Sequence, residues 1–126
     1  MRAIDTNVLI RLVTRDDATQ AKAADNFIAS GAWVSHLVLA EAVWLLESVY
    51  DLDKSRIARA VEMLLGHETL ALQDSDVVAA ALARFRRRSA PDFSGCLIVE
   101  IARKSGNLPV GTFDRALGKI DGAKRL

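Results

Sequence analysis

The sequence predicts a single globular domain of α/β fold with a central, mostly parallel sheet, and three observations point to it. Short apolar runs typical of strands alternate with longer segments of helical periodicity. The composition, 51% hydrophobic and 26% charged, is ordinary for a globular protein. A length of 126 residues suits one domain with its own core. Because strands that alternate with helices pair in parallel, we expect a single α/β domain over residues 1–126.

The expected elements follow in chain order, each from its own signal. "MRAI" is a short strand that ends at Asp5, and residues 17–30 repeat apolar side chains at helical spacing. "AWVS" is a second strand, after which Ser35 can cap a helix. The expected strands occupy residues 1–4, 32–35, 69–72 and 108–113. The expected helices occupy residues 17–30, 36–50, 54–66, 75–88 and 90–106.

Charge and cysteine content exclude several classes of protein. The net charge of +1 gives no global field toward nucleic acid or membrane. A single cysteine, Cys96, excludes an internal disulfide and fits a reducing compartment, and with only two histidines it argues against a zinc cluster. The longest apolar stretch, "LVLAEAVWLL", is too short to span a bilayer, and the first residues contain no apolar signal region. We therefore expect a cytoplasmic protein with no membrane partner.

Four acidic residues are candidates for a common site. Asp5 and Asp114 follow strands, and Asp92 heads a helix that would begin at the same edge of the sheet, where open α/β folds bind ligands. Glu41 lies within an apolar helix, where a buried carboxylate needs a partner, a proton or a metal. Oxygen ligands of this kind suit Mg²⁺ or Mn²⁺, which activate water and stabilise a phosphate under in-line attack.

Each acid also has a purely structural interpretation. Asp92 after Pro91 can be an N-cap, Asp5 a turn residue and Asp114 the cap of a last helix. Glu41 can lie on an exposed helix face. These alternatives stay open from the residues alone.

The chain resembles the PIN-domain ribonucleases, and within them the toxin half of VapBC toxin–antitoxin pairs. The motifs that carry the resemblance, in the family's order and spacing, are "IDTNVLIRL" (4–12), "LAEAVWLL" (39–46), "DFSGCLIVEIARKSG" (92–106) and "TFDRALGK" (112–119). The resemblance implies a three-layer α/β/α sandwich, usually dimeric, and an endoribonuclease dependent on Mg²⁺ or Mn²⁺. It also implies a small VapB-type antitoxin, and it matches Asp5, Glu41 and Asp114 to three of the family's acids.

The family's third acid has no counterpart in this chain. That stretch commonly reads Asp-Phe-(Ser/Ala)-Asp in this branch, and here Gly95 stands at the second aspartate. Asp92 lies three residues earlier on nearly the same helix face and can take over as a metal ligand. Alternatively the site is impaired, or Gly95 serves a close packing contact. Glycine inside a helix costs about 1 kcal/mol of stability relative to alanine, so the presence of Gly95 in the first turn of the expected helix needs a structural or functional explanation.

Neighbouring residues complete the expected site. Thr6, Asn7 and Thr112 flank the acids and would orient ligands or water on the metal. The basic run at residues 84–88 reads mainly as a solvated helix end, with RNA contact as a second role. The main rival function is a non-catalytic binding module of the same fold, disabled at Gly95. A phosphohydrolase with Asp5 as nucleophile is a further rival, although Asn7 stands where that class carries another acid.

Overall fold

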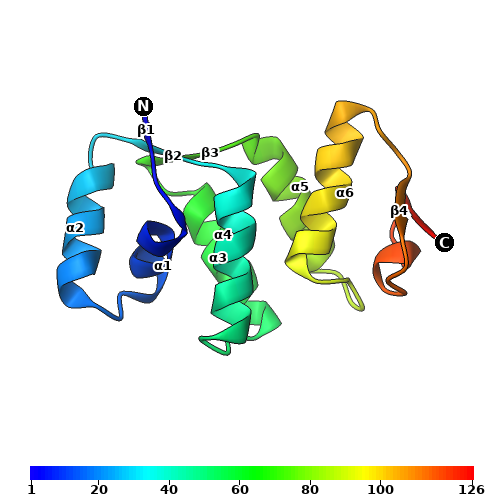
Figure 1. Cartoon of the computed structure of the whole chain (residues 1–126), viewed down its shortest axis with the longest axis horizontal. Helices are drawn as coiled ribbons and strands as arrows, with labels where there is room; N and C mark the ends of the chain where they lie inside the picture. Colours follow the sequence, from blue (N-terminus) through cyan, green and yellow to red (C-terminus); the bar gives the residue numbers. More distant parts are fainter. The chain divides into compact units, whose positions relative to one another are not determined.

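The computed structural model describes residues 1–126, and the chain divides into two compact units, Met1–Ser75 and Asp76–Leu126. Figure 1 labels the elements along the chain. The first unit contains β1 (Arg2–Ala3), α1 (Thr6–Thr14), α2 (Ala18–Ile28), β2 (Ala32–Val34), α3 (His36–Ser48), α4 (Lys54–Leu65) and β3 (Leu70–Leu72). The second contains α5 (Ser75–Phe85, which starts at the boundary), α6 (Phe93–Ser105), β4 (Val110–Thr112), the 3-10 helix η1 (Leu117–Lys119) and β5 (Ala123–Arg125).

Every strand pair in the molecule is parallel. The sheet of the first unit has the order β1-β2-β3, with Ala32 opposite both Arg2 and Leu70. The second unit pairs β4 with β5, Val110 opposite Ala123. Helices connect successive strands of the first sheet, as parallel pairing requires. The expected α/β class with parallel strands is confirmed.

Each unit has its own apolar core. In the first, Leu9 of α1, Leu39 of α3 and Ile57 of α4 are buried. In the second, Phe93 of α6 is fully buried and meets Phe85 of α5 edge-to-face, with ring centroids 5.8 Å apart. Cys96 is also fully buried, as expected for a small core residue. These cores hold the elements that carry the candidate acids.

Local capping explains several helix boundaries. Ser35 accepts a hydrogen bond from the backbone N–H of Val38 and begins α3, as predicted. Asp92 begins α6 in the same way. Helix α5 ends at Phe85, three residues before the predicted end, so most of the basic run lies beyond it. No helix in the chain is both long and apolar enough to cross a membrane.

Two elements were not predicted from the sequence. Helix α1 starts directly after Asp5, where the sequence offered a turn interpretation, and its apolar residues Leu9, Ile10 and Leu12 are buried. Strand β5 consists of three mostly exposed residues, Ala123–Arg125, without an apolar pattern. It forms because its backbone pairs with β4.

Candidate functional site

Asp5 lies between β1 and α1 and caps the helix. Its backbone is extended, and its Oδ1 accepts a hydrogen bond from the backbone N–H of Val8 over 3.1 Å. Backbone hydrogen bonding between β1 and β2 continues to the residue before Asp5, because the N–H of Ile4 donates to the carbonyl of Trp33. The side chain of Asp5 is exposed. Strand pairing on one side and the cap on the other therefore fix a carboxylate that solvent can reach.

Glu41 lies in the middle of α3, and its expected burial is wrong. Helix α3 buries a face formed by Leu39, Ala42, Val43 and Leu46. Glu41 is exposed on another face, beside the exposed Leu37 and Trp44. The apolar sequence of α3 predicted that every face of the helix is buried. In the structure, large apolar side chains on one face of this helix are exposed to solvent.

Thr6 connects the first two acids. Its hydroxyl donates a hydrogen bond to Glu41 Oε1 over 3.1 Å, across the contact between α1 and α3. Thr6 is the first residue of α1 and follows Asp5 directly. The structure thus places Asp5 and Glu41 in one neighbourhood with Thr6 between them. Asn7 is exposed nearby, and its carboxamide makes no hydrogen bond within the chain.

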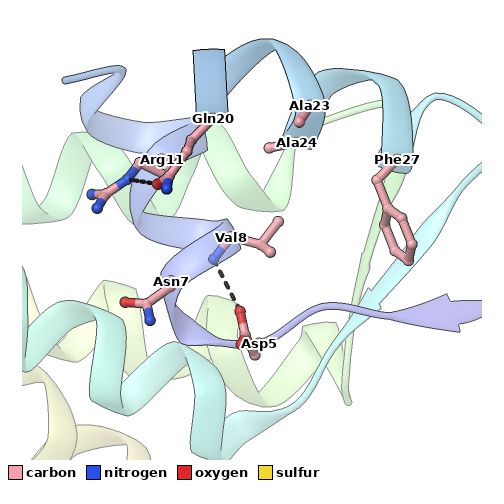
Figure 2. A pocket seen from close by; sticks show the side chains of 8 residues that line it. All are labelled: Asp5, Asn7, Val8, Arg11, Gln20, Ala23, Ala24 and Phe27. Atoms are coloured by element: carbon pink, nitrogen blue, oxygen red, sulfur yellow. Dashed lines mark hydrogen bonds between the residues drawn. The ribbon is translucent and has the colours of Figure 1, made fainter. Parts of the chain in front are cut away.

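A pocket of about 400 Å³ opens beside Asp5. Figure 2 shows that its walls come from α1 and α2. Its polar side chains are Asp5, Asn7, Arg11 and Gln20, and its apolar side chains are Val8, Ala23, Ala24 and Phe27. The pocket was not predicted from the sequence, because helix α1, which forms one of its walls, was not predicted. In the structure Phe27 is only half-buried.

Arg11 is held in place by several partners. Its Nε donates to Gln20 Oε1 over 2.6 Å, and its Nη1 donates to Asp16 Oδ1 and to the Tyr50 hydroxyl, each over 3.2 Å. The bond with Tyr50 is the main cause that raises the pKa of Arg11 above its ordinary value. Bonds from Thr14 and then Tyr50 lower the pKa of Asp16. This network fixes the position of Arg11 and orients Gln20 at the pocket.

Asp92 and Gly95 form the first turn of α6 in the second unit. The N–H of Gly95 donates to Asp92 Oδ1 over 3.0 Å, so Asp92 is an N-cap, as its structural interpretation proposed. Gly95 is buried and has no positive φ. A Cβ there would lie 2.9 Å from Asp92 Oδ1 and 3.4 Å from Leu117 Cδ1. Close packing therefore gives a local reason for glycine at this position.

Asp114 follows β4 and is also fixed by local hydrogen bonds. Its backbone N–H donates to Thr112 Oγ1 over 3.0 Å, and its Oδ1 accepts from the N–H of Leu117 over 2.8 Å. Leu117 is the first residue of η1. Its side chain also packs against Gly95 of α6, because Leu117 Cδ1 would lie 3.4 Å from a Cβ added at Gly95. Asp92 and Asp114 thus cap two elements that pack together around Gly95 and Leu117.

The four acids share one arrangement. Each uses one carboxylate oxygen for a hydrogen bond that orients it: Asp5 from Val8, Glu41 from Thr6, Asp92 from Gly95 and Asp114 from Leu117. The second oxygen of each accepts no hydrogen bond from the chain, and all four side chains are exposed. Such oxygens are the donors that Mg²⁺ and Mn²⁺ prefer.

The structure groups these acids in pairs. Asp5 and Glu41 belong to the first unit, and Asp92 and Asp114 belong to the second. Within either unit, no three acidic, histidine or cysteine side chains gather closely enough to hold a metal ion. Convergence of all four acids on one cation stays a prediction.

The family model of the PIN domain matches residues 3–123 of this chain. The chain belongs to the PIN-domain family. The match runs through both units and includes all four acids. No curated protein matches the chain as a relative.

Membership in the PIN family supports a nuclease-type function. PIN domains are generally nucleases that act on RNA and typically use divalent metals. The exposed, oxygen-only set of carboxylates in this PIN domain fits that chemistry.

Proposed function

We propose that this PIN domain is an Mg²⁺- or Mn²⁺-dependent endoribonuclease toxin of the VapC type, with tRNAs among its candidate substrates. The observation that carries the proposal is the free oxygen on each of four exposed acids, all within the matched region. Four carboxylates with little to neutralise them favour a divalent cation as their common partner.

Each acid has an assigned part in the proposal. Asp5, Asp92 and Asp114 hold the cation through the oxygens that make no hydrogen bond, and Glu41 completes the set of acids. The bound cation supplies water activation and charge stabilisation at the phosphate. The chain contributes pre-orientation: Thr6 fixes Glu41, and Thr112 holds the backbone of Asp114. Asn7, exposed and without a hydrogen-bond partner, orients a ligand at the same place.

The proposal includes two protein partners in the cytoplasm, a small VapB-type antitoxin and a second copy of this chain. Both need apolar surface, and α3 offers it. Leu37 and Trp44 of α3 are 70% and 62% exposed, and Val49 at its C-cap is 63% exposed. Large apolar side chains exposed along one helix favour a protein interface over a solvated surface.

The second candidate function is a binding module whose metal site is impaired, and Gly95 favours it. The position that carries a carboxylate in related toxins has no side chain here, and an added Cβ would lie 2.9 Å from Asp92 Oδ1 and 3.4 Å from Leu117 Cδ1. In this alternative the fold and the antitoxin partner remain and cleavage is absent.

One pair of variants separates the two functions. The purified chain, free of antitoxin, is incubated with a set of tRNAs in Mn²⁺ or Mg²⁺, with chelator controls. Asp5→Asn keeps a side chain that can cap α1 but removes one negative charge. Asp53→Asn makes the same change at the N-cap of α4, outside the candidate site, and is the matched control.

The nuclease proposal expects specific cleavage that chelation stops, that Asp5→Asn abolishes and that Asp53→Asn leaves unchanged. Cleavage by Asp5→Asn at the wild-type rate would contradict the assigned site. Absence of cleavage of any RNA by the wild type, with cleavage restored in Gly95→Asp, would establish the impaired module.

A further inference from the structure

The pocket between α1 and α2 has the size of a small-ligand site. Its volume of about 400 Å³ lies within the range of about 300–1,000 Å³ typical of such sites. Val8, Ala24 and Phe27 give it an apolar wall, and Ala23 stands exposed at its rim on α2. Asp5 lines the same space. A ligand seated here therefore lies directly beside the first acid of the candidate active site.

Two carboxamides in this pocket have hydrogen-bonding groups that the chain leaves unused. Asn7 makes no side-chain hydrogen bond in the chain. Gln20 Oε1 accepts a hydrogen bond from Arg11 Nε, and the side-chain amide N–H groups of Gln20 have no acceptor in the chain. Carboxamides present donors and acceptors that match the edges of nucleobases. Since Arg11 is fixed by Asp16 and Tyr50, the amide of Gln20 is oriented before any ligand arrives.

Phe27 adds an aromatic face. The guanidinium of Arg2 lies 3.8 Å from the centroid of the Phe27 ring and also donates to the Phe27 carbonyl over 3.0 Å. Arg2 thus covers one face of a half-buried ring that lines the pocket. Nucleobases stack on aromatic rings irrespective of sequence, and an adjacent arginine adds positive charge that favours RNA.

We propose that this pocket binds one unpaired nucleobase of the RNA substrate, next to the scissile phosphate that the proposed nuclease function puts beside Asp5. The inference rests on the proposed nuclease function and adds to it the base that flanks the cut. A single base suits the pocket better than a partner helix does, because a docked helix needs a row of apolar sites at i, i+4 and i+7. The carboxamide of Asn7 and the free amide N–H groups of Gln20 provide hydrogen-bond readout instead.

The first test uses free nucleosides and needs neither metal nor cleavage. Adenosine, guanosine, cytidine and uridine are titrated into the full chain, and the side-chain amide resonances of Asn7 and Gln20 are followed by NMR. The expected result is a saturable shift with one nucleoside preferred severalfold over the others. Failure of all four nucleosides to shift these amides would overturn the proposal.

Filling the pocket gives the matched comparison. Ala23→Leu adds bulk at the rim on an exposed helical position, and Ala18→Leu makes the same change on α2 outside the pocket. We expect Ala23→Leu to remove nucleoside binding and Ala18→Leu to retain it. Asn7→Ala, at an exposed residue without hydrogen-bond partners, is a second variant that does not disturb packing and is expected to weaken the preference among bases.

The cleavage arm separates this inference from the proposed function. If the wild type cleaves RNA, Ala23→Leu is expected to lose the base preference beside the cut. If Ala23→Leu cleaves RNA with an unchanged base preference, the proposal that this pocket binds a base is wrong, and the proposed nuclease function still stands. If the chain binds a nucleoside but cleaves no RNA, the pocket is a base-binding site and the proposed nuclease function is wrong. If Ala23→Leu binds nucleosides normally but no longer binds its antitoxin, the occupant is a protein and the proposal is wrong.

Discussion

The hydroxyl of Thr6 donates a hydrogen bond to Glu41 Oε1 over 3.1 Å, although 35 residues separate them in the chain. Thr6 begins α1 directly after Asp5, and Glu41 lies in the middle of α3. The bond therefore ties the second acid to the helix that the first acid caps. It leaves the other oxygen of Glu41 without a partner in the chain, which is what an oriented ligand requires.

Thr6→Val tests this orientation, because it removes the hydroxyl and keeps the shape. We expect kcat of the proposed nuclease to fall about two- to twelvefold, the equivalent of one net hydrogen bond of about 0.5–1.5 kcal/mol. Thr6→Ser keeps the donor and is expected to retain most of the activity. Single-turnover cleavage at saturating RNA gives the comparison. Equal rates for Thr6→Val and wild type would show that Glu41 needs no support from Thr6.

Gly95 and Asp92 are predicted to be energetically coupled. Alanine at position 95 gains about 1 kcal/mol in helix propensity. Its Cβ, however, would lie 2.9 Å from Asp92 Oδ1, so the cap must move, and a lost N-cap costs about 1 kcal/mol. We expect Gly95→Ala to leave the free energy of unfolding nearly unchanged.

A double-mutant cycle detects this compensation. Asp92→Ala is expected to cost about 1 kcal/mol in the wild-type background and clearly less in the Gly95→Ala background. Urea unfolding of the four proteins supplies the free energies. Strict additivity would mean that Asp92 caps α6 equally well with a side chain at position 95, and the packing explanation of the glycine would be wrong.

Much of this fold could be predicted from sequence because its signals are local. The apolar run at residues 69–72, the cap at Ser35 and the helical spacing in α4 each depend on neighbouring residues, and the structure confirms them. The missed elements depend on distant ones. Helix α1 is stabilised by burial of its apolar face, and β5 exists through pairing with β4.

The candidate site shows the same division. Asp5, Asp92 and Asp114 could be assigned to the ends of elements because caps and strand ends leave a mark in the sequence. The exposure of Glu41 could not be predicted, since it depends on which face of α3 packs inward. The pocket could not be predicted either, because Gln20 and Phe27 come from one helix and Asn7 from another. Whether the two pairs of acids share one cation stays a prediction.

The ion pair between Arg15 and Asp25 predicts a pH dependence of stability. Two hydrogen bonds, of 3.1 and 2.6 Å, join the end of α1 to α2. The bonds from Arg15 lower the pKa of Asp25 below its ordinary value of 3.8. A carboxylate whose pKa is lower in the folded state contributes stability above pH 3.8, and that contribution is lost as the pH falls through the folded value.

Thermal unfolding between neutral pH and pH 3 measures this contribution. Asp25→Asn is expected to lower Tm slightly at pH 7, and its difference from wild type should shrink as the solution is acidified. Because both side chains are about half-exposed, the effect is small. Arg15→Gln removes the same pair and should show the same convergence. A difference that stays constant with pH would contradict the role of the carboxylate charge.

Trp44 offers the sharpest test of α3 as an interface. Its side chain is 62% exposed on a helix whose opposite residues form the core. We expect Trp44→Gln to change the free energy of unfolding of the isolated chain by less than about 0.5 kcal/mol, as for a surface position. If α3 is the interface, the same change weakens self-association or antitoxin binding at least tenfold, because buried tryptophans dominate interface energies.

Light scattering across a dilution series measures the dimer, and calorimetric titration measures the antitoxin. Lys22→Gln, on the exposed surface of α2, serves as the control that should alter neither. A loss of several degrees in Tm for Trp44→Gln would show that the chain itself covers this side chain, and the interface would have to be sought elsewhere. Unchanged stability with unchanged association would remove α3 from the proposed partner surface.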